Sequence, residues 1–166
     1  MSERSYFGKY RGKVELNLDP ELRGRIQVSC AEVLGDGKLA WAMPCVPYAD
    51  TGAGWFAIPP IGADVWVEFE GGRKESPIWS GCFWGLPATA PTPLGEPVKM
   101  FKTAGFTVTV MDLPPAFATM DIEMNPGPFP FKLSVGPAGV SIEYGASKIA
   151  LDGISVSINN GALEVT

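Results

Sequence analysis

The last 28 residues, 139–166, constrain the fold most, because apolar residues alternate with small or polar ones along this segment. Strict alternation is typical of a β-strand with one buried face. The apolar set shifts between even and odd positions from one run to the next, so the segment predicts four short strands. Glycines at 145, 153 and 161 mark corners between them. Strands whose parity shifts in this way are not expected to belong to one flat sheet.

A ribbon this thin, with no helix nearby, cannot bury its own apolar side. We therefore expect the burial to come from other copies of the chain. Three chains winding about one axis would turn the apolar faces inward and pair each strand with a strand of another chain. The predicted axis residues are Val140, Ile142, Ile149, Leu151, Ile154, Val156, Ile158, Leu163 and Val165. The alternative, in which the ribbon extends the sheet of the preceding domain, remains open.

The magnitudes favour several chains over one. Full burial of an aliphatic side chain contributes about 1.5–3 kcal/mol, so the axis residues together supply about 15–25 kcal/mol per chain. Ordering the ribbon costs about 1–2 kcal/mol per residue, which is at least as much. A single chain, which realises little of this burial, is not expected to hold the ribbon in place.

Residues 7–85 predict a separate compact β-barrel. Two runs, 23–30 and 63–70, each place three apolar residues on one face, namely Ile26, Val28 and Cys30, and Val65, Val67 and Phe69. Five main strands within this length suit a small Greek-key barrel of the oligonucleotide/oligosaccharide-binding (OB) type. A sandwich of similar size fits the pattern nearly as well.

Composition separates the two regions. Four of the twelve residues in 86–97 are proline, which predicts an extended linker. The predicted organisation is an all-β chain with an OB-fold barrel at 1–85, a Pro-rich linker at 86–98 and a β-helical spike at 99–166.

Charge and residue usage exclude several function classes. The net charge of −5 argues against a nucleic-acid partner, since phosphate contacts need clustered cations. The absence of histidine removes Ser-His-Asp and Cys-His catalysis and histidine-based zinc sites. Cys30, Cys45 and Cys82 are too widely spaced for a zinc motif and are expected to be buried thiols. We therefore expect no enzyme activity, no cofactor and no metal.

The five tryptophans, at 41, 55, 66, 79 and 84, support an alternative. Aromatic side chains on a barrel can form a stacking platform, so the barrel could bind oligosaccharide or single-stranded nucleic acid. Packing in the core and between subunits is the favoured interpretation of these residues. The N-terminus carries no apolar signal segment, so we expect assembly in the cytoplasm.

Several segments of the barrel resemble one family. The motifs GKYRGKV (8–14), DPELRGRIQV (19–28) and GWFAIPPIGADVWVEFEGG (54–72) are similar to the barrel of phage baseplate assembly protein V, the central spike of contractile injection systems. The same barrel is similar to that of type VI secretion valine-glycine-repeat spikes. KTAGFTVTVMD (102–112) continues the resemblance into a β-helical tail.

The resemblance implies a homotrimeric spike at the centre of a baseplate, with an intertwined triple-stranded β-helix after the barrel. The barrel would attach to a hub protein, and a conical tip protein of the PAAR type would cap the blunt end at Leu163, Glu164, Val165 and Thr166. Without histidine the chain cannot carry a histidine-bound iron tip, which favours a separate cap. The spike would be part of a phage virion or a phage-derived particle, and would meet a target membrane only by mechanical puncture.

Overall fold

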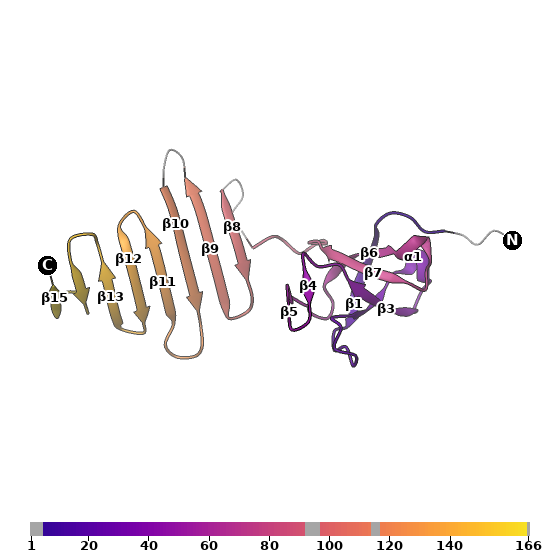
Figure 1. Ribbon diagram of the computed structural model, residues 1–166, viewed down its shortest axis with the longest axis horizontal. Coiled ribbons are helices and arrows are strands. Elements are labelled where there is room, and N and C mark those ends of the chain that lie inside the picture. The colour runs from indigo at the N-terminus through magenta and orange to yellow at the C-terminus, as the bar shows by residue number, and fades with distance from the viewer. Residues whose placement is uncertain (1–4, 92–96, 114–116, 166) are drawn as a thin grey trace. The chain divides into compact units, whose positions relative to one another are not determined.

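The computed structural model describes residues 5–91, 97–113 and 117–165, and these are almost entirely β-structure (Figure 1). The only helical segments in the described part are short, α1 (Ala31–Leu34) and η1 (Glu70–Gly72). Neither is long or apolar enough to cross a membrane. The chain divides into two compact units between Thr89 and Ala90. The predicted all-β class is confirmed.

The N-terminal unit is a closed barrel with strand order β1-β2-β3-β7-β6. Its strands are β1 (Tyr10–Leu16), β2 (Ile26–Ser29), β3 (Leu39–Pro44), β6 (Asp64–Phe69) and β7 (Pro77–Cys82). Neighbours run antiparallel except β3 and β7, whose parallel pairing joins the barrel's two halves. A small hairpin, β4 (Ala49–Asp50) and β5 (Ala53–Gly54), forms a sheet of its own. Closure confirms the barrel over the sandwich.

The barrel interior is built from the predicted alternation. Ile26 and Val28 on β2 and Val65 and Val67 on β6 are fully buried. Their neighbours Gln27 and Trp66 are only half-buried, as expected for strands with one inner face.

Only one of the three cysteines belongs to this core. Cys30 is buried, whereas Cys45 and Cys82 are exposed, so the prediction of buried thiols is wrong for these two. Cys45 lies just beyond the end of β3. Cys82 is the last residue of β7, where the pairing with β6 becomes irregular opposite Val65, and its side chain stays exposed at this strand end.

The C-terminal unit is one eight-stranded antiparallel sheet in which each strand pairs with the next along the chain (Figure 1). The strands are β8 (Val98–Lys102), β9 (Phe106–Leu113), β10 (Phe117–Met124), β11 (Phe131–Gly136), β12 (Gly139–Tyr144), β13 (Ser147–Leu151), β14 (Val156–Ile158) and β15 (Leu163–Val165). The alternative, an extension of the barrel's own sheet, is wrong for the described residues.

Turn length explains the shifting parity. Tyr144 faces Ser147 across a two-residue turn, Leu151 faces Val156 across four residues, and Ile158 faces Leu163 across four. Facing residues share one side of an antiparallel sheet, and a turn of even length gives them opposite parity. The expectation that shifting parity keeps these strands out of one sheet is therefore wrong.

The turns also account for the spaced glycines. Gly145, Gly153 and Gly161 lie in three successive turns, and all have positive φ, at 59°, 89° and 93°. Such angles favour glycine. Pairing between chains was expected for every strand. This is wrong for β9 to β14, because each of them pairs on both sides within its own chain.

Candidate self-association surface

One face of the C-terminal sheet is apolar along its whole length. Because facing residues share a side of the sheet, the register sorts the side chains into rows that cross the strands. One row consists of Phe101, Val108, Ile122, Leu133, Ile142, Ile149, Ile158 and Leu163. Beside it run Lys99, Val110, Met120, Val135, Val140, Leu151, Val156 and Val165. We call these two rows the apolar face. Lys99, its one charged member, pairs with Asp112.

Nothing within the described chain buries this face. Ile142 and Ile149 remain 42% exposed, Leu163 56% and Val165 61%. All described residues of the buried core belong to the barrel. A contiguous apolar surface of this kind marks a protein–protein interface.

The opposite face of the same sheet is polar. Glu123, Lys132, Glu143 and Lys148 face one another in turn across β10 to β13. Lys132 Nζ lies 3.2 Å from Glu123 Oε1, and Lys148 Nζ lies 2.9 Å from Glu143 Oε1. The hydrogen bond to Glu123 raises the pKa of Lys132. We call this row the charge ladder. Charged side chains of this kind favour contact with water, whereas the side chains of the apolar face favour burial.

The structure brings together eight of the nine residues predicted for the axis, on the apolar face. Ile154 is the exception. It lies in the turn between β13 and β14 and is 84% exposed. Of the residues predicted for the tip, Leu163 and Val165 end the two apolar rows. Glu164 lies in β15, and Thr166 lies outside the described residues.

The sequence interpretation missed half of this face. Val108, Ile122 and Leu133 extend the row of Ile142 toward β8. The alternation of 106–110 was visible, but the proline-rich stretch 113–130 separates it from the ribbon. The register of β9, β10 and β11 is what joins the two parts.

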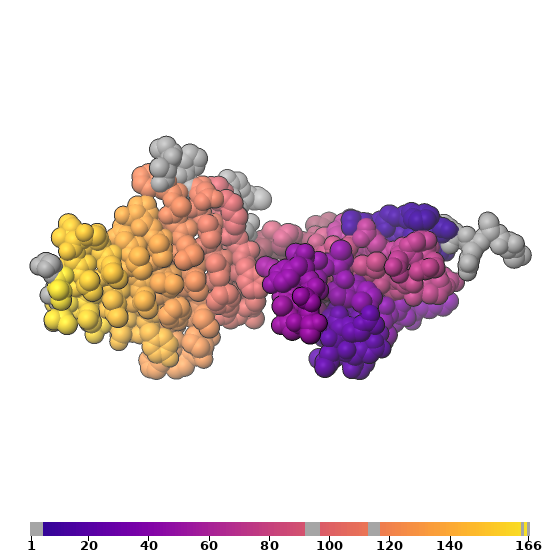
Figure 2. Space-filling model, viewed as in Figure 1, coloured from indigo at the N-terminus to yellow at the C-terminus, as the bar shows by residue number. Residues whose placement is uncertain are grey.

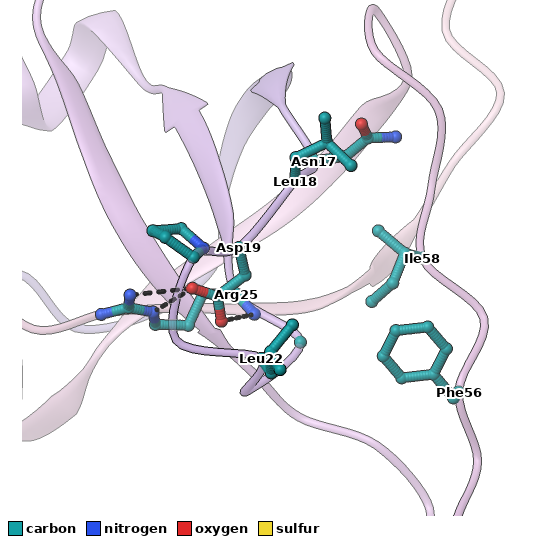
Figure 3. Close-up of a pocket in the computed structure, with 9 residues that line it drawn as sticks. Asn17, Leu18, Asp19, Leu22, Arg25, Phe56 and Ile58 are labelled. Atoms are coloured by element: carbon teal, nitrogen blue, oxygen red, sulfur yellow. Dashed lines mark hydrogen bonds and ion pairs between the residues drawn. The ribbon is translucent and has the colours of Figure 1, made fainter.

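The barrel carries a second exposed apolar surface, at the loop between β1 and β2 (Figure 3). Asp19 organises this loop, because its carboxylate accepts hydrogen bonds from the backbone N–H groups of Glu21 (3.0 Å) and Arg23 (2.8 Å). The Arg25 guanidinium, 2.8 Å away, holds the pKa of Asp19 far below its usual range. The loop holds Leu22 at φ 55° with 92% of its surface exposed.

Leu22 stands between two hollows. One, of about 400 Å³, has an apolar lining that includes Leu18, Phe56 and Ile58. The other, of about 480 Å³, shares Phe56 and Ile58 and adds Tyr48 and Trp55. Figure 3 shows Phe56 and Ile58 on a separate segment across from Leu22. We call Leu18, Leu22, Phe56 and Ile58 the Leu22 patch. Leu18, Leu22 and Phe56 are each at least 76% exposed, and a cluster of exposed apolar side chains is typical of a contact surface.

The tryptophans have divided roles. Trp79 is buried and donates its Nε1–H to the Gly24 carbonyl oxygen (3.3 Å), which confirms a core role for this one. Trp66 packs on Phe83 with ring centroids 4.5 Å apart, and the Arg11 guanidinium lies 5.3 Å from the Trp66 ring. Trp55 and Trp84 are more than half exposed. No group of acidic or cysteine side chains in the described residues is arranged to hold a metal ion.

Both units match known families. Residues 10–84 match the type VI secretion system/phage-baseplate injector OB domain, and residues 97–164 match the phage baseplate V C-terminal trimerisation domain. A comparison with curated proteins finds no match. The second family assigns self-association as a homotrimer to the unit that carries the apolar face. The chain therefore belongs to the phage baseplate V family, with an injector OB barrel followed by a trimerisation domain.

Proposed function

We propose that this protein is the central spike of a phage baseplate or of a related contractile injection particle. Three arms would wind around one axis as a β-helix and pierce the target envelope when the particle contracts. The observation that carries the proposal is the contrast between the two faces of the sheet. The apolar face needs a cover, whereas the charge ladder behind it needs water.

Closed three-fold symmetry satisfies both faces. Each sheet turns its apolar face toward the axis, where the other two sheets cover it, and leaves its charge ladder outside. Burial of these side chains at about 25 cal/mol per Å² then becomes available to the assembly. Strands run across the axis, so the ladder of hydrogen bonds follows the direction of thrust.

The arm narrows toward its C-terminus. Strands β9 and β10 have eight residues each, whereas β14 and β15 have three. At about 3.3 Å per residue, the width falls from about 26 Å to about 10 Å. Figure 2 shows the same narrowing from the orange strands to the yellow ones. A tapering cross-section supports a piercing role.

The two ends of the spike have separate partners in this proposal. The Leu22 patch supports attachment of the barrel to a hub protein, because Leu18, Leu22 and Phe56 are exposed and the Asp19 loop fixes the backbone around Leu22. At the other end, Leu163 and Val165 lie on the last strand and are the most exposed hydrophobic residues of the apolar face. They would seat a small conical tip protein.

The mechanism is mechanical and needs no reaction. The protein would act without enzyme activity, assemble in the cytoplasm and leave the cell as part of the particle. Its stiffness would come from the continuous hydrogen-bonded ladder and from the apolar contact of three sheets along one axis. Force applied at the barrel is transmitted along this column.

Electron microscopy of the particle tests the proposal. Deletion of the gene from a strain that makes the particle should remove the central density below the tail tube and abolish killing or infection. The wild-type gene should restore both, and a variant that cannot form trimers should not. Particles that keep their central density and activity without the gene would overturn the proposal.

A further inference from the structure

Ile154 is a large apolar side chain that the apolar face does not use. It lies between β13 and β14, beyond the end of both strands, and is 84% exposed. Its backbone is fixed, because the Asp152 carboxylate accepts hydrogen bonds from the N–H groups of Ile154 (3.0 Å) and Ser155 (2.8 Å). The exposure of Ile154 therefore belongs to an ordered turn.

The turns of the sheet alternate between its two lateral edges (Figure 1). One edge carries the turns 137–138 and 152–155. The other carries the turns 125–130, 145–146 and 159–162. Turns on one edge are thus staggered by one strand relative to turns on the other. Ile154 lies at a height between the turns 145–146 and 159–162 of the opposite edge.

Three-fold symmetry brings unlike edges together. Three copies of one sheet can turn the same face toward a three-fold axis. The edge with the turns 137–138 and 152–155 in one copy then lies beside the opposite edge of the next copy. A pure rotation about the axis leaves heights along it unchanged. With strands running across the axis, the turn holding Ile154 therefore meets the notch between the turns 145–146 and 159–162 of the neighbouring chain.

The notch has room for an added side chain. Its two turns contribute the small residues Gly145, Ala146, Gly161 and Ala162, all of them exposed. A Cβ placed on Gly161 would meet nothing within 4 Å, whereas one on Gly145 would lie 2.9 Å from the Phe129 ring, so the free space is on the side of the turn 159–162. An exposed isoleucine opposite small residues forms a contact that buries apolar area without a clash.

We propose that Ile154 of each chain packs into this notch of the next chain and closes the corner of the trimer. The partner is a second copy of this chain, because the corner borders the apolar face and residues 97–164 match a trimerisation domain. Ile154 is then a contact between neighbouring chains at the rim, and not an axis residue. This inference rests on the axial arrangement given under the proposed function.

Paired cysteines test the contact. In full-length protein with Cys45→Ser and Cys82→Ser, we expect Ile154→Cys combined with Ala146→Cys or with Ala162→Cys to give covalent three-chain species in most of the sample after oxidation or treatment with a short bismaleimide. The control pair, Ile154→Cys with Ala138→Cys, places both cysteines on one edge. It should link no more than Ile154→Cys alone.

The mass in solution separates two kinds of failure. Three copies in the absence of reagent, with no cross-link from either opposite-edge pair, would overturn the Ile154 contact and leave the spike intact. Equal cross-linking by the control pair would overturn the contact as well. One copy at all concentrations would overturn the trimeric spike together with the contact.

Discussion

Ile142 on β12 lies directly opposite Ile149 on β13, and each side chain keeps 42% of its surface exposed in a single chain. One residue along, on the other face, Glu143 and Lys148 form an ion pair with 2.9 Å between Oε1 and Nζ. The same two strands thus have a charged side that is stable in water and an apolar side whose exposure to water is unfavourable. In the proposed arrangement of the homotrimer, the other two sheets would supply the missing cover.

A charge on the apolar face should prevent assembly. In Val156→Asp, three carboxylates would meet near the axis, each with a desolvation cost of several kcal/mol. We expect light scattering on a sizing column to give the mass of one chain for this variant, with the barrel still folded. Ser157→Asp is the matched control, because Ser157 is the next residue and points to the polar face. Equal trimer yield from both variants would refute the assignment of Val156 to the axis.

The turn between β11 and β12 should tolerate only glycine at its end. Gly139 has φ 121°, and a Cβ at this position would overlap the carbonyl oxygen of Leu151. We expect Gly139→Ala to lower the thermal midpoint more than Gly153→Ala. Gly153 also has positive φ, which costs an alanine about 1–2 kcal/mol, but a Cβ there meets nothing within 4 Å. Equal midpoints by circular dichroism would argue against the close approach at Gly139.

Asp19 should make barrel stability depend on pH. Its pKa is lowered in the folded state, chiefly by the Arg25 hydrogen bond, so the charged form stabilises the fold above the ordinary carboxyl pKa of about 3.9. This contribution is lost as pH falls below that value toward the folded pKa. Asp19→Asn should therefore lower the midpoint at neutral pH and weaken its decline in acid. Asp36→Asn, at an exposed turn, should have the thermal midpoint of the wild type. If it lowered the midpoint as much as Asp19→Asn, a special role for Asp19 would be contradicted.

The charge ladder should be sensitive to charge reversal. Lys132→Glu would place three carboxylates in a row across β10, β11 and β12, at a cost of about 0.2–1 kcal/mol for each facing pair. We expect a lower thermal midpoint that partly recovers at high salt. Lys102→Glu, in the same row but facing Thr107, should change it less. Equal thermal midpoints of the two variants at every ionic strength would show that the charge ladder does not contribute to stability.

Ligand titration addresses the alternative role of the barrel. Trp55 and Trp84 are exposed enough for their fluorescence to report stacking by a sugar or a base. We expect no saturable change with chito-oligosaccharides or oligothymidylate, because the net charge is negative and the Arg11 guanidinium already lies over Phe83 and Trp66. Saturation with either probe would favour a binding module.

The sequence predicted the barrel well because its burial takes place inside one chain. Alternation on β2 and β6 translated directly into Ile26, Val28, Val65 and Val67 at full burial. Strand ends broke the rule, as Cys45 and Cys82 show. The Leu22 patch had no signal, since exposed apolar residues in loops follow no period.

The arm was predicted in outline and misread in detail. Ile154 and Val156 are two residues apart, so the alternation assigns them to one strand. The hydrogen bond from the Ile154 N–H to Asp152 instead places Ile154 in the turn before β14. A turn with an even number of residues shifts the parity of the apolar positions in the same way as a change of sheet. Parity alone therefore does not distinguish a hairpin from a new sheet. Residues such as Ile122 and Leu133 were missed because their row becomes visible only when strands are set in register.

The pairing of each arm strand with its immediate neighbours in sequence makes spike length a modular quantity. Insertion of one hairpin with two even turns would lengthen the arm by two strand spacings, about 9.5 Å. Parity would return to its starting value, so every downstream side chain would keep its side. The length of the arm could therefore change by whole hairpins while the residues at either end stay the same.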